Sequence, residues 1–376
     1  MTLSRLSKLS NSLSSHLPGS EPAGGLDALV LNAGPSLVYL TGMHFHLSER
    51  PVIAVFASGH EPVIFLPELE MLKLSGLPFQ IQAFSYGENP ADWEGIFRTA
   101  ISTLKLKSER IGVEPRQLRL LEFNLVHACI PEGIFPDASE LISNLRARKD
   151  GDEIAAIRKA VIVAQSALEA TIPLIKSGMT EKELSAELVV QLLRHGSQPE
   201  MPFAPIVSSG PNSANPHAVP TERKIQHGDL LVVDWGAAVD GYVSDLTRTF
   251  AVGKVDAEYR KIHQIVLEAN GAGRQTGKPG LPCAQVDKAA RTVIEKAGYG
   301  EYFTHRTGHG IGMEGHEAPY LRADNMQLLA EDMVYTVEPG IYLPDRNGVR
   351  IEDNLVITQD GADCLSDMSR ELRIVG

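Results

Sequence analysis

The residues best suited to chemistry are two acids on either side of a tight turn. The segment Leu230–Phe250 reads LLVVDWGAAVDGYVSDLTRTF, and its first apolar run ends on Asp234. An Asp-Gly pair, Asp240-Gly241, follows between apolar flanks and precedes Asp245. Asp-Gly in this setting predicts a two-residue hairpin turn, because such a turn needs φ > 0 at both central positions.

This turn fixes the relation between the two acids. With Asp240 and Gly241 at its centre, Asp245 lies opposite Gly236, which shares a sheet face with Asp234. Asp234 and Asp245 then become diagonal neighbours with Cβ atoms roughly 7–8 Å apart. Carboxylates this close repel each other unless a cation lies between them. A hard divalent metal ion is the natural occupant.

A later stretch repeats the design. Asp332–Glu338 is a second apolar strand that ends in a carboxylate, and the returning strand, Val349–Ile357, carries Glu352. We expect the turn at Asp345–Gly348, although the Pro339-Gly340 step interrupts the strand and leaves the register open. Two hairpins with two acids each suggest a duplicated half-domain that folds around a shared metal centre.

A nitrogen ligand is available in the glycine-rich segment TGHGIG, where His309 is flanked by residues that let the backbone pack closely. Taken singly, each acid is more typical of a solvated surface. Asp234 and Glu338 differ, since each ends an apolar run where an unpaired charge is costly. Four carboxylates and one imidazole suit two hard or borderline divalent ions. Two ions about 3.5–4 Å apart lower the pKa of a bridging water toward 7 and hold a hydroxide beside a polarised carbonyl.

Four segments resemble the signatures of the pita-bread metallopeptidases, the family of Xaa-Pro aminopeptidase, Xaa-Pro dipeptidase (prolidase) and methionine aminopeptidase. They are GDLLVVDWGAAVDGYVSDLTRTF, HRTGHGIGMEGHEAPY, VYTVEPGIY and GVRIEDNLVIT. NAGPSLVYLTG and ERPVIAVF are more loosely similar to the creatinase/prolidase amino-terminal domain. Methionine aminopeptidases usually lack that domain, and so the resemblance favours the proline-directed branch.

The resemblance implies a role for each metal ligand. Asp234 would bind one metal ion, His309 and Glu338 the other, and Asp245 and Glu352 would bridge the two. Glu338 would also carry the proton from the attacking water to the leaving proline nitrogen. Manganese is the metal that the resemblance favours, while the ligands also accept cobalt or zinc.

Further site residues follow from the same resemblance. His217 and His316 would hold the substrate and stabilise the tetrahedral intermediate, and His305 would be a third active-site histidine. Tyr342 and Arg350 would orient the ligands. Without the family context, His217 is typical of a hydrogen-bonded loop residue, Tyr342 of the core, and Arg350 of a partner for a nearby acid.

The expected function is that of a dinuclear-metal exopeptidase that hydrolyses the N-terminal Xaa-Pro bond of peptides, an Xaa-Pro aminopeptidase. The alternative is Xaa-Pro dipeptidase, which the sequence favours less because it shows no clear device for binding a substrate carboxylate. More distant alternatives are a metal-free creatinase-like amidinohydrolase and a binding module without catalysis. The resemblance also implies a homodimer, and Arg50 is a candidate to reach the active site of a partner subunit.

Composition bounds these expectations. The chain has 376 residues and a net charge of −12, with a pI of about 5.5, which argues against nucleic-acid binding. No apolar run approaches the ~18 residues that a membrane helix needs. The 3 cysteines are far apart and form no CxxC pattern, which predicts reduced thiols and a cytoplasmic protein.

We expect two domains and an α+β fold overall: a small α/β creatinase/prolidase-like domain over residues 1–146 and a pita-bread catalytic domain over residues 147–376.

Leu3, Leu6, Leu9 and Leu13 predict an amphipathic first helix, although the Ser-rich, basic start also resembles a transit peptide. Apolar runs predict strands at Leu26–Leu31, Leu37–Leu40, Val52–Phe56, Val63–Leu66 and Glu371–Val375. Helical spacing predicts helices at Trp93–Leu104, Gln117–Ala128, Glu153–Ile175, Thr180–His195, Glu258–Gly271 and Ala284–Ala297. The segment Pro202–Pro220 is expected to be a loop.

Overall fold

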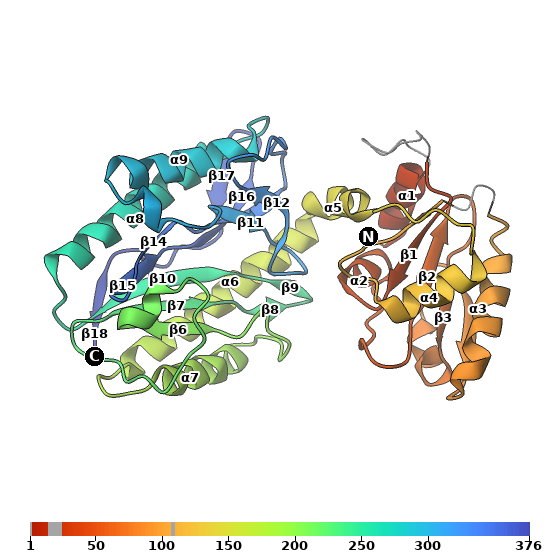
Figure 1. The fold of residues 1–376 in the computed structure, drawn as a ribbon, viewed down its shortest axis with the longest axis horizontal. Helices are drawn as coiled ribbons and strands as arrows, with labels where there is room; N and C mark the ends of the chain where they lie inside the picture. Colours follow the sequence, from red (N-terminus) through yellow and green to blue (C-terminus); the bar gives the residue numbers. More distant parts are fainter. Residues whose placement is uncertain (1, 14–24, 107–109) are drawn as a thin grey trace. The chain divides into compact units, whose positions relative to one another are not determined.

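The computed structural model describes residues 2–13, 25–106 and 110–376. The chain divides into two compact units, Met1–Arg146 and Ala147–Gly376 (Figure 1). Within the described ranges, no helix has both the length and the apolar character needed to cross a membrane.

The first unit is built on a five-stranded mixed sheet with the strand order β4-β3-β2-β1-β5. Every residue of β1, β2 and β3 is buried, and α3 and α4 pack on the sheet through residues such as Phe97 and Val126. The strands are β1 (Ala28–Asn32), β2 (Ile53–Ala57), β3 (Val63–Pro67), β4 (Gln82–Tyr86) and β5 (Ile111–Gly112). The α-helices are α1 (Thr2–Leu13), α2 (Pro35–Thr41), α3 (Trp93–Ser102), α4 (Leu120–Cys129) and α5 (Ser139–Ala147), and the 3₁₀ helices are η1 (Glu68–Leu74) and η2 (Pro90–Asp92).

The strand expected at Leu37–Leu40 is wrong, because this segment lies in helix α2. Pro35 occupies the first turn, where its missing N–H costs nothing. Gly42 ends the helix in the left-handed conformation, with φ of 75°, and its N–H donates to Val38 O. These two end signals outweigh the apolar run, which supplies the buried face of the helix.

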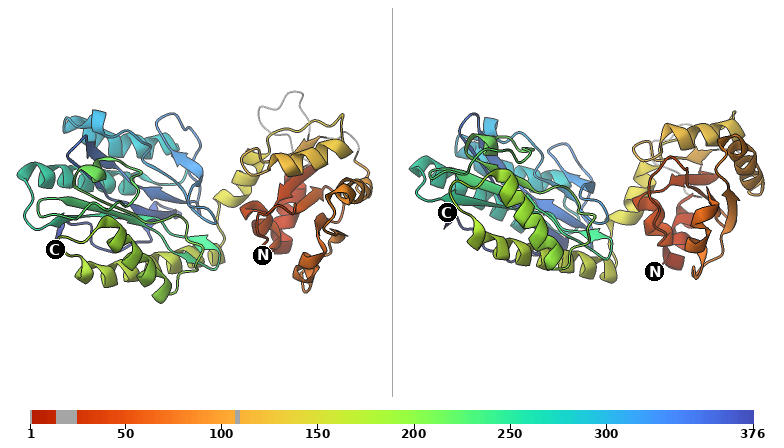
Figure 2. Two further views of the ribbon diagram at one scale, coloured as in Figure 1. Left: turned by 60° about the horizontal axis from the view of Figure 1, so that its bottom comes forward. Right: turned by 90° about the horizontal axis from the view of Figure 1, so that it is seen from below.

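The second unit has two larger sheets, each with a pair of helices on its outer side, and two two-stranded sheets, β14-β15 and β8-β9. α6 and α7 cover the sheet β18-β10-β7-β6, while α8 and α9 cover the sheet β12-β11-β13-β16-β17. The turned views of Figure 2 show the same arrangement. The unit therefore has the expected α+β architecture.

The helices of this unit are α6 (Gly151–Thr171), η3 (Ile172–Leu174), α7 (Glu181–Arg194), η4 (Gly210–Ala214), α8 (Ala257–Thr276), α9 (Cys283–Lys296) and η5 (Gly300–Tyr302). The strands of the first half are β6 (Ile206–Ser209), β7 (Leu230–Trp235), β8 (Ala238–Val239), β9 (Tyr242–Val243) and β10 (Leu246–Val252). The strands of the second half are β11 (Gly308–Gly310), β12 (Glu317–Leu321), β13 (Val334–Val337), β14 (Gly340–Leu343), β15 (Asn347–Arg350), β16 (Asp353–Ile357), β17 (Ala362–Cys364) and β18 (Arg373–Val375).

The register predicted for the first hairpin is confirmed. Asp240 and Gly241 both have positive φ, 53° and 78°, as the two-residue turn requires. Val239 pairs with Tyr242 at the turn, and the same register continues to the pair Asp234 and Thr247.

The second hairpin has a shorter turn than expected. Gly340 pairs with Arg350 and Leu343 with Asn347, and so the turn is centred on Asp345, which takes a φ of 59°. Asn347 and Gly348, expected in the turn, already belong to β15. The Asn347 side chain accepts from Leu230 N at 2.8 Å, which draws this end of the strand onto the first hairpin.

Both hairpins are interrupted where they carry acids, and the freed backbone groups pair across to the other hairpin. Glu352 N donates to Thr247 O at 3.1 Å. Asp245 N donates to Asn354 Oδ1 at 3.1 Å, and the Asn354 amide donates back to Asp245 O. The two half-domains are thus joined at the acids themselves.

The loop expected over Pro202–Pro220 is wrong in part. It contains β6 and η4, and β6 pairs antiparallel with β7 through pairs such as Val207 with Val233. The strand has only two apolar residues, and the prolines and serines around it are typical of a loop, which is why the sequence did not predict it.

A buried ion pair joins the start of the second unit to β12. Lys149 Nζ lies 2.6 Å from Glu317 Oε1, and the two side chains are 1% and 9% exposed. The Lys149 N–H also donates to Asp332 O at 3.0 Å. Glu317 directly follows His316, and so this pair holds the strand next to that histidine.

Breaking the pair is expected to destabilise the protein strongly. Lys149→Met removes the cation that lies against the buried Glu317 carboxylate, at a cost of about 3–5 kcal/mol. Adding Glu317→Gln to the Lys149→Met variant should restore part of that loss, as measured by urea unfolding. A Lys149→Met variant as stable as the parent would contradict the assignment.

Candidate metal centre

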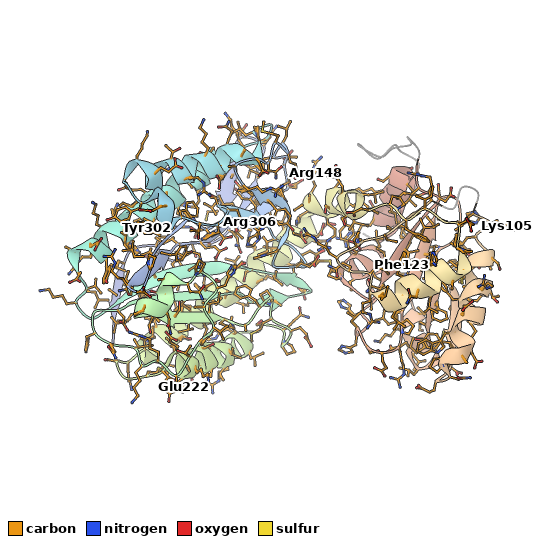
Figure 3. All side chains as sticks on the ribbon, viewed as in Figure 1. Lys105, Phe123, Arg148, Glu222, Tyr302 and Arg306 are labelled. Atoms are coloured by element: carbon orange, nitrogen blue, oxygen red, sulfur yellow. The ribbon has the colours of Figure 1, made fainter. Side chains whose placement is uncertain are left out.

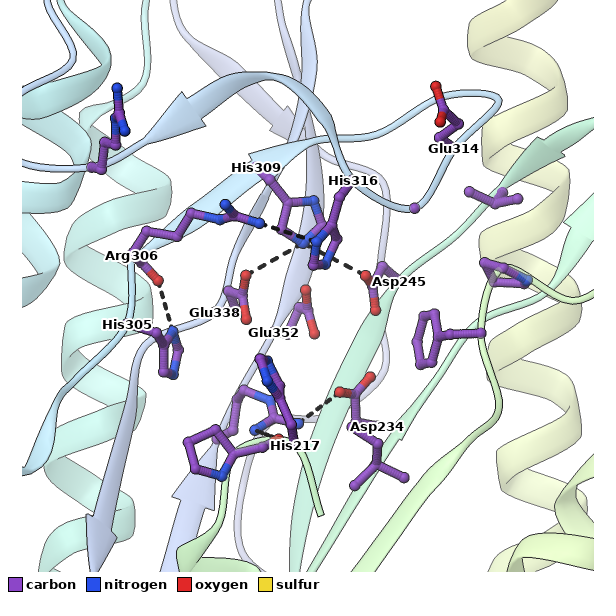
Figure 4. Close-up of a pocket in the computed structure, with 18 of the residues that line it drawn as sticks. His217, Asp234, Asp245, His305, Arg306, His309, Glu314, His316, Glu338 and Glu352 are labelled. Atoms are coloured by element: carbon purple, nitrogen blue, oxygen red, sulfur yellow. Dashed lines mark hydrogen bonds and ion pairs between the residues drawn. The ribbon is translucent and has the colours of Figure 1, made fainter. Parts of the chain in front are cut away.

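Four acids and one histidine from separate strands meet in the second unit. Asp234 comes from the end of β7, Glu338 follows β13, His309 lies in β11, and Asp245 and Glu352 precede β10 and β16. Figure 4 shows the acids between His217 on one side and His309 with His316 on the other. Three overlapping groups have ligand atoms within 4.8 Å of one another: Asp234, Asp245 and Glu352; His309, Glu338 and Glu352; and Asp245, His309 and His316.

His309 presents one ring nitrogen to the acids. Its Nδ1 lies 3.1 Å from Gly310 O, and because a carbonyl only accepts, Nδ1 carries the proton. Nε2 is then a free lone pair, 3.3 Å from Glu338 Oε1 and 3.7 Å from Asp245 Oδ2. Burial lowers the pKa of His309 well below its ordinary value, which keeps the ring neutral, as a ligand must be.

The glycines around His309 are required by close backbone packing. A Cβ on Gly308 would lie 1.9 Å from Thr336 O, and one on Gly310 would lie 2.1 Å from Ala318 O. Both glycines let β11 lie between β12 and β13 with the imidazole directed to the acids.

The donor atoms fit a pair of hard cations. Asp234 Oδ1 and Glu352 Oε1 are buried and have no hydrogen-bond partner among the described residues. Buried oxygens of this kind are costly unless something binds them. Burial, together with the charges of Glu352 and Asp234, raises the pKa of Asp245 well above its ordinary value. Burial raises the pKa of Glu338 to about 7. Divalent ions would relieve both the desolvation and the repulsion.

Arg350 holds one of these acids in place. Its Nη2 donates to Asp234 Oδ2 at 2.6 Å, and its Nε donates to Thr247 Oγ1 at 3.1 Å. Thr247 in turn donates to Glu352 Oε2 at 2.7 Å. One oxygen of Asp234 and one of Glu352 are therefore occupied, and the other of each faces the site. Sequence reasoning missed Thr247, although its pairing with Asp234 follows from the predicted register.

The chain of hydrogen bonds continues from Arg350 to His305. Arg350 Nη1 donates to Tyr342 Oη at 3.0 Å, and Tyr342 Oη lies 2.8 Å from His305 Nε2. His305 Nδ1 lies 2.7 Å from Arg306 O, and so Nδ1 carries the proton and Nε2 accepts from tyrosine. Both ring nitrogens of His305 are engaged, which makes it a support for Tyr342 in this structure.

The remaining two histidines face the pocket. His316 packs its ring 3.9 Å, centroid to centroid, from that of His309. Burial and the neighbouring Arg306 lower the pKa of His316 to about 4. His217 is exposed on the opposite wall, and its backbone N–H donates to Asn215 Oδ1 at 3.2 Å.

The pocket around these groups has a volume of about 1330 Å³. Apolar side chains, including Met201, Phe203 and Met313, line it beside the acids. Arg306 also lines it, with Nη2 3.1 Å from His316 Nδ1. Arg306 lies near the middle of the second unit in the view of Figure 3. Sequence reasoning missed this arginine, although it lies three residues before His309 in HRTGHG.

Two family models match the chain. Residues 155–359 match metallopeptidase family M24, and residues 22–148 match the creatinase/prolidase N-terminal domain. Among relatives, a putative dipeptidase of Bacillus subtilis is 33% identical over 351 residues, covering 93% of this chain and 96% of that protein.

Two solved structures are similar over nearly the whole chain. A dipeptidase from Pyrococcus horikoshii has 34% identity and a TM-score of 0.89, covering 99% of this chain and 100% of that one. A prolidase from Thermococcus sibiricus has 33% identity and a TM-score of 0.91, covering 100% of this chain and 99% of that one.

The raised carboxyl pKa values predict an unusual pH dependence for the chelated protein. The pKa of Glu338 is about 7 in the folded chain but about 4.3 when unfolded, and so the folded state binds the proton more tightly. The metal-free protein should therefore lose stability as the pH rises through this window. Thermal unfolding across it measures the effect, and Glu338→Gln should flatten the slope. A midpoint that rises instead would rule out the assignment.

Proposed function

The chain belongs to metallopeptidase family M24 and has its pita-bread α+β fold, and from this we propose that it is a dipeptidase that hydrolyses Xaa-Pro dipeptides. This proposal replaces the aminopeptidase favoured by the sequence, which rested on the lack of a carboxylate-binding device. The observation that carries the proposal is the side chain of Arg306.

Arg306 is a cation in the pocket with no ion pair to a carboxylate among the described residues. Its guanidinium lies beside His316 Nδ1 and over the ring of Tyr320, 4.7 Å from the centroid. The other arginines that line the pocket are engaged: Arg291 with Asp287 at 2.9 Å, Arg322 with Asp324 at 3.0 Å, and Arg350 with Asp234. Arg306 is thus the guanidinium best placed to receive a substrate carboxylate.

The position of Arg306 suits a substrate of two residues. Arg306 contacts His316, and a ligand atom of His316 lies within 4.8 Å of ligand atoms of Asp245 and His309. In a dipeptide the terminal carboxylate follows the scissile bond by a single residue, about 3.8 Å of backbone. A longer peptide would place its next amide, not a charge, at the guanidinium.

We assign the ligand roles as the resemblance implies them. Asp234, Asp245, His309, Glu338 and Glu352 would hold two divalent ions, which we take to be manganese. When bound, such ions lower the pKa of a coordinated water and polarise the substrate carbonyl. Arg350 keeps Asp234 turned to the site, and Thr247 does the same for Glu352.

Proton transfer and substrate binding fall to the chain's own side chains. Glu338, whose pKa is raised to about 7 by burial, can accept a proton from the attacking water and return it to the proline nitrogen. His217 and His316 face each other across the acids and would contact the scissile peptide from its two sides. Neutral His316, held by Arg306, is suited to hydrogen bonding.

Substrate length tests the proposal most directly. An Xaa-Pro dipeptide should be cleaved efficiently, and the same dipeptide extended by one residue or amidated at its terminus should be poor, because the charge that binds Arg306 is lost. Equal or faster cleavage of the tripeptide would identify an aminopeptidase instead.

The arginine itself can be tested with a matched control. Arg306→Ala should raise the KM for the dipeptide by roughly 10–100-fold, which corresponds to the free energy of one charge-assisted hydrogen bond. The KM for the amidated dipeptide should remain nearly unchanged, because that substrate has no terminal carboxylate. Arg322→Ala removes an arginine from the same pocket that is already paired with Asp324 and should have a much smaller effect. Equal effects of the two variants would remove the role of Arg306.

Metal removal separates this activity from the amidinohydrolase alternative. Exhaustive chelation should abolish dipeptide hydrolysis, and manganese should restore it, with about two ions bound per chain at full activity. Glu352→Gln, which removes one candidate bridging carboxylate, should lower the number of ions bound. Full turnover by a metal-free protein would overturn the proposal.

A further inference from the structure

A loop between β6 and β7 brings His217 to the pocket. It leaves β6 at Ser209, passes through η4, and returns by way of Thr221 and Arg223. The middle of the loop is fixed by Arg350, whose Nη1 donates to Pro216 O at 3.1 Å. His217 itself is exposed, and so its position depends on this bond and on how the two ends of the loop are held.

The carboxylate of Glu181 binds both ends of this loop. Glu181 is the first residue of α7 and is fully buried. Its Oε1 accepts from Ser209 N at 2.7 Å and from Ser209 Oγ at 2.9 Å. Its Oε2 accepts from Thr221 N at 3.0 Å and from Thr221 Oγ1 at 2.6 Å. The Asn212 amide donates to both oxygens, at 3.0 and 3.2 Å.

The helix start returns the contact through its backbone. Glu181 N donates to Arg223 O at 3.1 Å, and Lys182 N donates to Thr221 O at 3.2 Å. The first N–H groups of a helix have no partner within it, and here the loop supplies one. Lys182 also pairs with Glu222, 2.8 Å away on the surface, at the lower margin of the unit in Figure 3. The positive end of the helix dipole favours the buried carboxylate.

Helix α7 does not need Glu181 as a cap. Its capping box is made by Thr180 and Glu183: Glu183 N donates to Thr180 Oγ1 at 3.1 Å, and Thr180 N donates to Glu183 Oε2 at 2.8 Å. The Glu181 carboxylate receives its hydrogen bonds from the loop instead. A buried carboxylate bonded in this way to both ends of one functional loop is placed to shape that loop.

We propose that Glu181 is a positioning residue for substrate binding: by joining Ser209, Asn212 and Thr221, it fixes the loop that presents His217 to the peptide. This inference rests on the proposed function for its kinetic part only. Glu181 is not among the described residues that line the pocket, and it acts through His217.

Glu181→Gln and Glu183→Gln form a matched pair for the test. Each removes one negative charge from the first turn of α7. In Glu181→Gln the new side-chain amide cannot accept from the donors of both loop ends, since its nitrogen must face Ser209 or Thr221 as a second donor. Glu183→Gln keeps an acceptor for Thr180 N and leaves the loop untouched.

Hydrogen exchange of the metal-loaded, full-length protein tests the loop without any substrate. Amides over residues 209–221 should exchange faster in Glu181→Gln, by about an order of magnitude or more, and remain as in the parent in Glu183→Gln. Unchanged exchange in Glu181→Gln would overturn the proposal, whatever the protein cleaves.

Kinetics then test whether the loop acts through His217. Glu181→Gln should raise the KM for the Xaa-Pro dipeptide by roughly tenfold with a smaller change in kcat. In a His217→Ala background the same change should add little, because interacting residues are not additive. Fully additive effects, or an equal KM change in Glu183→Gln, would reduce Glu181 to a structural residue. Faster loop exchange in a protein that leaves Xaa-Pro dipeptides intact would refute the dipeptidase assignment alone.

Discussion

The repulsion among four carboxylates, three buried and one, that of Glu338, partly buried, is the constraint on which the second unit depends. Burial and mutual charge raise the pKa of Asp245, Glu352 and Glu338 above the ordinary range, and so the folded chain without cations holds these groups at a cost. Neighbouring side chains stabilise two of these carboxylates by hydrogen bonds. Hydrogen bonds occupy one oxygen each of Asp234 and Glu352, and the other oxygen of each remains for a cation.

The same constraint explains why the two hairpins are interrupted. A continuous ladder would pair every backbone group within one hairpin and would leave the halves independent. The breaks next to Asp245 and Glu352 free N–H and C=O groups that bond across, as between Glu352 and Thr247 or Asp245 and Asn354. The spacing of the acids is thereby held by a backbone hydrogen bond, from Glu352 N to Thr247 O, and by the bonds between the Asp245 backbone and the Asn354 side chain.

The sequence alone predicted the fold correctly where the residue types at a turn determine the backbone conformation. Asp240-Gly241 specified its turn, and the register that followed placed Asp234 beside Asp245 correctly. The second hairpin contains an Asn-Gly pair, Asn347-Gly348, but both residues lie in β15 and the turn comes earlier, at Asp345. The Asn347 side chain accepts from Leu230 N, a contact remote in sequence that the local pattern does not show. Helix α2 was mistaken for a strand because a short apolar run has no clear period.

Residues that act through distant partners were the hardest to find. Arg306 stands in a motif that the sequence singled out, yet its lack of a carboxylate partner among the described residues is visible only once the other pocket arginines are seen to be paired. Glu181 shows no signal at all, since its loop partners lie 28 to 40 positions away. The function of such residues is a property of the assembled fold.

The hydrogen bonds between the two hairpins also determine when, during synthesis of the chain, the site can form. Asp234 and Asp245 leave the ribosome long before Glu338 and Glu352, and the first hairpin cannot complete its backbone pairing until Thr247 meets Glu352. A nascent chain that ends before Glu338 therefore contains only two of the four carboxylates. The complete set of candidate ligands therefore exists only after synthesis has passed Glu352, and the final geometry of the site forms only when both hairpins are present.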